Sequence, residues 1–68
     1  MAVVKVIELL AESGQSWEDA ARQAVAEAAK TVRGISSVYI SEFQATVEND
    51  KVKNFRINAK ISFVVGKG

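Results

Sequence analysis

The pattern of hydrophobic and polar residues predicts a strand, a helix and two further strands. Residues 2–11 form a short segment rich in Val, Ile and Leu, with apolar residues on both alternating faces. This pattern predicts a strand that is either central in a sheet or covered by a partner chain, followed by a loop over residues 12–15. Residues 52–65 alternate between apolar and polar positions, which is the strongest pattern in the chain. It predicts a long strand with one buried face and one face open to solvent, a ligand or a cavity.

A helix is predicted between the first two strands, from Trp17 to about Arg33. Ser16 is a suitable N-cap, because its hydroxyl can accept a hydrogen bond from a free amide of the first turn. Asp19 completes a weak form of the capping box. Gly34 is expected to follow the helix in a left-handed conformation. Residues spaced by three and four positions form one stripe that is mostly alanine: Trp17, Ala20, Ala21, Ala24, Ala28, Thr31 and Val32.

Residues 37–48 predict a further strand, whose more apolar face changes near Ser41 and Glu42. Such a change predicts a β-bulge or a strong bend. Asn49 and Asp50 then predict a turn, because both residue types tolerate positive φ. The last two strands should form an antiparallel hairpin, with the third strand between the first two to give a right-handed crossover. The predicted fold is α+β: one β-α-β-β domain over residues 1–68, with a three-stranded sheet curled around one helix.

Composition narrows the possible functions. The chain has 68 residues, a net charge of +1, no Cys and no His. The balanced charge argues against general nucleic-acid binding, and the missing residue types exclude disulfides, thiolate nucleophiles and histidine bases. Ser62 and Lys60 share a strand face, but nothing marks Ser62 as activated, so no enzyme is expected. Lys5 and Glu8 argue against a signal peptide or a membrane span at the start, so a cytoplasmic location is expected.

The small size of the chain favours self-assembly. A domain of this length buries only about 60% of its unfolded surface, and small chains without disulfides or metals usually need oligomerisation or very good packing. A well-packed monomer is the alternative. The uncovered face of the predicted sheet also favours partner chains as its cover.

Two further features have a functional and a structural interpretation. Glu48, Asn49 and Asp50 offer oxygen ligands at a turn, but three adjacent residues cannot surround a calcium ion without a second subunit. Their alternative interpretation is a solvated rim. Trp17 is either a stacking platform for an aromatic ligand or a packing residue, and its position in the helix stripe favours packing.

Three stretches carry a resemblance to a known family: VVKVIELLAES, SWEDAARQAVAEAAKTVRGI and FRINAKISFVV. With the β-α-β-β order and the chain length, they make the sequence resemble the dodecins over nearly its whole length. The resemblance implies a sheet that wraps one helix and a hollow, spherical homododecamer. It also implies a binding and storage protein for flavins such as riboflavin or FMN, which stack in pairs at subunit contacts, and not an enzyme.

The flavin-binding positions of the family differ in this chain. Typical members carry a tryptophan at the start of the second strand, where this sequence has Ser37. They carry a glutamine on the polar face of the third strand, where this sequence has Arg56. Serine offers no ring for stacking, and arginine donates hydrogen bonds but cannot accept them. The resemblance therefore implies a flavin-equivalent pocket in which flavin binding is weakened or lost. The candidate residues of this pocket are Ser37, Arg56, Val38, Asn54 and Asn58.

Three functions follow as alternatives. The first is a dodecin-like shell that binds a small ligand, such as a flavin held in a weakened mode. The second is a shell that does not bind flavin and instead holds an ion or an anion, such as calcium at carboxylates between subunits. The third is a purely structural assembly.

Overall fold

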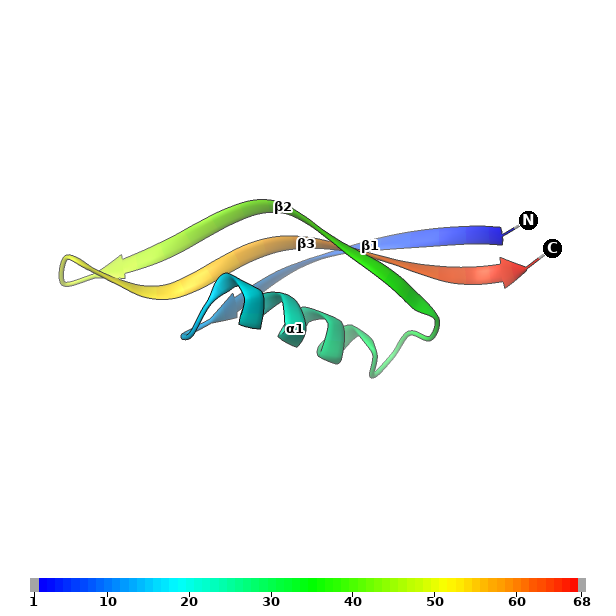
Figure 1. Cartoon of the computed structure of the whole chain (residues 1–68), viewed down its shortest axis with the longest axis horizontal. Coiled ribbons are helices and arrows are strands. Elements are labelled where there is room, and N and C mark those ends of the chain that lie inside the picture. Colours follow the sequence, from blue (N-terminus) through cyan, green and yellow to red (C-terminus); the bar gives the residue numbers. More distant parts are fainter. Residues whose placement is uncertain (1, 68) are drawn as a thin grey trace.

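A computed structural model describes residues 2–67 and confirms the predicted β-α-β-β order. The elements are β1 (Ala2–Ser13), α1 (Trp17–Ala28), β2 (Ile35–Glu48) and β3 (Lys51–Lys67). The strand order is β1-β3-β2, and both outer strands run antiparallel to β3 (Figure 1). The long alternating strand therefore occupies the centre of the sheet, as predicted. Within the described residues, no helix is long and apolar enough to span a membrane.

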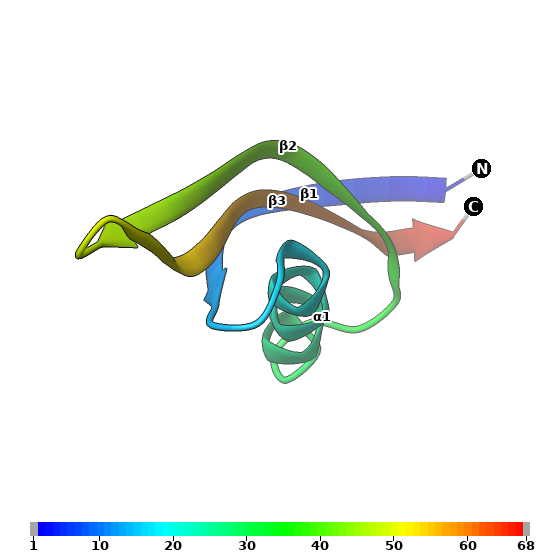
Figure 2. The same ribbon diagram turned by 60° about the vertical axis from the view of Figure 1, so that its left-hand side comes forward.

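The sheet curves around α1, which lies on its concave side (Figure 2). The core is formed by the alanine stripe of the helix and the apolar face of β3: Ala20, Ala24, Ala28, Ile57, Ala59 and Ile61. Ile57 and Ile61 are the largest fully buried side chains. Because alanine adds little volume, the helix approaches the sheet closely and the two layers enclose a thin core.

The start of α1 is fixed by two serines. Ser16 accepts a hydrogen bond from the Asp19 amide at 2.9 Å, which confirms the predicted N-cap. The carboxylate of Asp19 accepts from the Ser13 hydroxyl at 2.6 Å, and Ser13 in turn accepts from the Ser16 amide at 3.4 Å. Ser13 at the end of β1 therefore mediates the contact that a capping box makes directly. Hydrogen bonds from Ser13 and then Gln23 hold the pKa of Asp19 below its usual value.

The predicted end of the helix at Arg33 is wrong, because α1 ends at Ala28. The chain leaves the helix early to reach the sheet, where the Gly34 carbonyl accepts a hydrogen bond from the Val64 amide at 3.1 Å. Gly34 has φ 75°, and a Cβ at this position would lie 3.3 Å from the Val64 oxygen. Val32, which extends the apolar stripe in the sequence, packs at the edge of the core from the connection instead.

The strands are longer than predicted, and one of their irregularities falls where the sequence placed it. β1 continues to Ser13, so Glu12 belongs to a strand and not to the predicted loop. The pairing of β2 with β3 shifts between Ile40 and Glu42, which confirms the bulge. Asn49 and Asp50 have φ values of 54° and 64°, which confirms the turn.

The chain is less compact than a typical domain of its length. Its radius of gyration is 14.0 Å, whereas about 11 Å is expected for 68 residues. Its accessible surface is 4955 Å², whereas a compact 7.4 kDa monomer exposes about 4200 Å². The β2–β3 hairpin contributes to this shape, because its tip projects beyond the helix (Figure 1). A single chain therefore leaves an unusually large surface uncovered.

Candidate functional site

The candidate site lies on the sheet surface that is turned away from α1, here called the outer face. Alternate residues of β3 are buried against the helix, so the residues between them lie on this opposite side. The strand register places neighbours from β1 and β2 beside them. Its members are Asn54, Arg56, Asn58, Lys60, Ser62 and Val64 of β3, Val4, Val6, Glu8, Leu10 and Glu12 of β1, and Ser37, Tyr39, Glu42 and Gln44 of β2.

Large apolar side chains remain uncovered on the outer face. Val4, Val6, Leu10 and Tyr39 are 52%, 55%, 75% and 64% exposed. They surround the polar residues that run along the middle of β3. An apolar surface with a polar centre is typical of an interface or a ligand site.

Four of the five predicted pocket residues share this face, but they do not form one pocket in a single chain. Val38 lies on the opposite side of the sheet, packed against the core beside α1. Ser37 pairs with Ser62, which lies six positions from Arg56 along β3. At ~3.4 Å per residue, this separation is about 20 Å. A compact pocket that includes both Ser37 and Arg56 must therefore take them from different copies of the chain.

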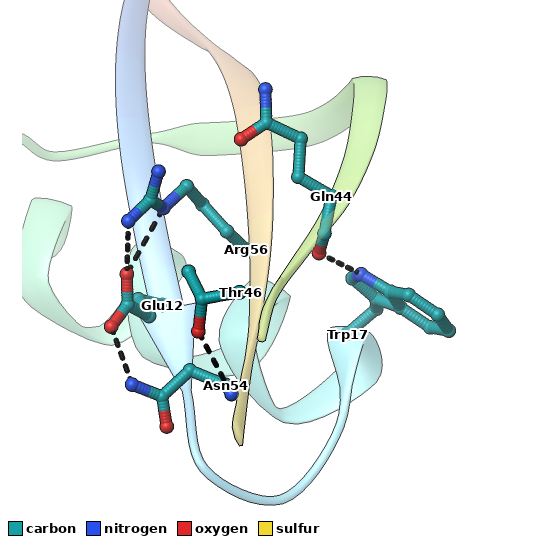
Figure 3. Close-up of polar contacts among 6 residues, drawn as sticks. All are labelled: Glu12, Trp17, Gln44, Thr46, Asn54 and Arg56. Atoms are coloured by element: carbon teal, nitrogen blue, oxygen red, sulfur yellow. Dashed lines mark hydrogen bonds and ion pairs between the residues drawn. The ribbon is translucent and has the colours of Figure 1, made fainter. Parts of the chain in front are cut away.

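Arg56 is held by an acidic residue of the neighbouring strand. The Arg56 Nε and Nη2 atoms lie 3.0 Å and 2.9 Å from Oε1 of Glu12. The Asn54 amide donates to Oε2 of the same carboxylate at 2.7 Å (Figure 3). Hydrogen bonds from Arg56 and then Asn54 hold the pKa of Glu12 below its usual value, so this carboxylate is charged at neutral pH.

At the other end of the outer face, Ser37 belongs to a cluster of hydroxyls. The Ser37 hydroxyl bonds to that of Ser62, which also lies 3.3 Å from the Ser36 hydroxyl. Between the two ends, the amide oxygen of Asn58 is buried and has no hydrogen-bond partner within the described residues. The Ser37 end of the outer face therefore carries a group of small hydroxyl side chains.

Trp17 has a packing role, as its place in the helix stripe indicated. Its ring makes edge contacts with Phe43 and Phe55, at centroid distances of 5.7 Å and 5.0 Å. Its indole nitrogen donates to the Gln44 carbonyl at 2.7 Å (Figure 3). These contacts fasten the start of α1 to the base of the hairpin, away from Ser37.

Among residues 2–67, no three His, Cys, Asp or Glu side chains lie close enough together to hold a metal ion. At the hairpin, Glu48 lies 2.9 Å from Lys53 and is already paired.

Sequence analysis missed two members of the outer face. Glu12 was assigned to a loop, and its contact with Arg56 depends on the register between β1 and β3. Tyr39 was not assigned to the candidate pocket, although its alternation with Ser37 along a strand places both on one face. Extending the first predicted strand by one residue includes Glu12 and gives it the same parity as Leu10, which is the available sequence signal.

Comparison with known proteins agrees with this architecture. The Dodecin family model matches residues 3–66. The calcium dodecin of Mycobacterium tuberculosis is 35% identical over 63 residues, covering 93% of this chain and 89% of that protein. A crystal structure described as that organism's calcium-chelating immunodominant antigen, calcium dodecin, has a TM-score of 0.82 at 31% identity, covering 98% and 96% of the two chains. A variant of the Thermus thermophilus dodecin has a TM-score of 0.91 at 27% identity, covering 98% of this chain and 100% of that chain. The chain is therefore a member of the dodecin family.

Proposed function

We propose that this chain assembles into a homododecameric shell that binds a small ligand between its copies. The observation that carries the proposal is the separation of Ser37 from Arg56 on one uncovered sheet face. Assembly covers the exposed apolar residues of that face and brings residues of different copies together. The open shape of the single chain supports the same conclusion, because its radius of gyration is 14.0 Å. The proposed role is binding and storage, without catalysis.

The residues of the outer face do not fit the usual flavin contacts of the family. Ser37 provides no π surface, so the stacking contribution of a ring is missing. Arg56 provides donors only, and Glu12 already occupies its Nε donor and one N–H of its Nη2 atom. Flavin binding is therefore weak or absent in this chain compared with members that keep the tryptophan and glutamine.

A double substitution tests this proposal directly. Ser37→Trp with Arg56→Gln restores a stacking ring and a hydrogen-bond acceptor, so we expect at least about a tenfold gain in riboflavin affinity. The measurement is quenching of riboflavin fluorescence on titration with protein of verified assembly state. Ser36→Trp with Arg56→Gln is the matched control, because it places the ring one position away. Equal quenching by the two double variants, or no gain over the wild type, would contradict the proposed pocket.

Calcium is the second candidate ligand, because the Mycobacterium tuberculosis relative is described as a calcium dodecin. If calcium binds between copies, it should stabilise the assembly by about 2.7 kcal/mol at a concentration 100 times the Kd. The measurement is thermal unfolding with calcium, with magnesium as the control and with a chelator to reverse the effect. An unchanged unfolding midpoint in millimolar calcium would argue against this candidate.

A further inference from the structure

The carboxylate of Glu12 accepts hydrogen bonds from a group of donors of the kind that binds anions in proteins. Two of these donors come from the guanidinium of Arg56, at 3.0 Å and 2.9 Å from Oε1. The third is the amide of Asn54, at 2.7 Å from Oε2. Arg56 and Asn54 are alternate residues of β3, and Glu12 reaches them from β1 (Figure 3). Both oxygens of the carboxylate are therefore engaged.

The same donors suit an anionic group of a ligand. A guanidinium binds carboxylate and phosphate oxygens with two parallel hydrogen bonds, and an adjacent amide adds a third donor. The side chains of Arg56 and Glu12 are each 40% exposed, so solvent reaches the pair. A ligand anion approaching this point meets a negative charge already in place, and it must displace Glu12 to use the donors.

We infer that the Arg56 and Asn54 donors form an anion-binding site on the outer face and that the Glu12 carboxylate fills this site. Glu12 thereby determines which ligands can bind there. It excludes ligands that carry phosphate or carboxylate at Arg56, and it leaves uncharged ligands unaffected. The shell therefore selects uncharged small molecules at this position. This inference rests on the proposed ligand-binding role of the outer face, but the anion site itself is contained within one chain.

Glu12→Gln tests the inference, because it keeps the shape of the side chain and removes its charge. We expect this variant to bind FMN about tenfold more tightly than the wild type, while its riboflavin affinity changes by less than about twofold. The difference between the two flavins isolates the phosphate group. We also expect the variant to broaden the phosphorus NMR signal of inorganic phosphate, whereas the wild type leaves it unchanged. The gain in FMN affinity and the broadening of the phosphate signal should both diminish at high salt, because the new contacts are charge-assisted and partly exposed.

Glu18→Gln is the matched control. Glu18 also pairs with an arginine, Arg22 at 3.4 Å, and its replacement changes the net charge by the same amount on α1 instead of on the outer face. A second control, Glu12→Gln with Arg56→Gln, removes the cation and should abolish the gain. Glu12→Ser should reproduce the gain if the glutamine variant does not fold.

Three results would overturn the inference. The first is equal FMN affinity in the Glu12 and Glu18 variants, and the second is an equal gain for riboflavin, which indicates a steric opening. The third is a Glu12→Gln protein that is folded and does not bind inorganic phosphate. Because phosphate binding requires neither a flavin nor a shell, this measurement decides the inference separately. A wild type that is monomeric and binds no flavin would instead count against the proposed function.

Discussion

Val6→Glu is expected to dissociate the assembly into single chains. Val6 lies on the outer face, 55% exposed, beside Ser62. Assembly covers this face under the proposed function, so the substitution places an unpaired carboxylate in an interface. Burying such a charge costs several kcal/mol for each copy, and the cost recurs at every equivalent contact of a symmetric shell. The effect on assembly should therefore be nearly complete at micromolar concentration.

Sedimentation velocity measures this outcome. The wild type should give a molecular mass of roughly 90 kDa, which is the mass of twelve copies of the 7.4 kDa chain. The Val6→Glu protein should give a molecular mass close to that of one chain. Ala26→Glu is the matched control, because Ala26 is an exposed residue on the helix, so its variant should keep the assembled mass. A Val6→Glu protein that retains the assembled mass would show that the outer face is not an interface.

Ile61→Ala is expected to produce the largest loss of stability within the fold. Ile61 is 0% exposed and pairs with Ile7 on one side and Val38 on the other, so it joins all three strands beneath α1. The core contains few large side chains, and the alanine stripe of the helix cannot move to fill the space. We therefore expect a loss of about 2–4 kcal/mol, which corresponds to a decrease in Tm of roughly 10–25 °C.

Thermal unfolding at a fixed protein concentration measures this loss, because the Tm of an assembling protein depends on concentration. Ile61→Val provides a graded comparison, with an expected loss of about 0.5–1.5 kcal/mol. Thr31→Ala, at an exposed position after α1, should change stability by less than about 0.5 kcal/mol. Similar losses for Ile61→Ala and Thr31→Ala would contradict the view that this position is the centre of the core.

Local sequence pattern was sufficient for most of the fold. The alternation along β3 predicted which face is buried, and Ile57, Ala59 and Ile61 are indeed buried against the helix. The Asn49–Asp50 turn and the bulge before Glu42 were also predicted, because each depends on the conformational preferences of a few adjacent residues. The N-cap at Ser16 has the same local origin.

The candidate site depended more strongly on contacts between distant segments. The polar face of β3 could be predicted, but the register places Ser37 and Arg56 about 20 Å apart in one chain, so a pocket with both residues requires more than one copy. The end of α1 was predicted too late, because the connection to β2 is fixed by the contact of Gly34 with Val64 and not by helix propensity. The pairing of Glu12 with Arg56 joins residues 44 positions apart.

The sequence by itself determined the order of the elements, the buried face of the central strand and the residue types on the opposite face. Periodicity and turn preference act over a few residues, so these features can be predicted without knowing the rest of the chain. Only the tertiary structure decided that Glu12 contacts the donors of Arg56 and that Ser37 and Arg56 lie about 20 Å apart on one face of the sheet. Strand register and the bulge control both results, because a shift of one residue exchanges the faces of every following side chain.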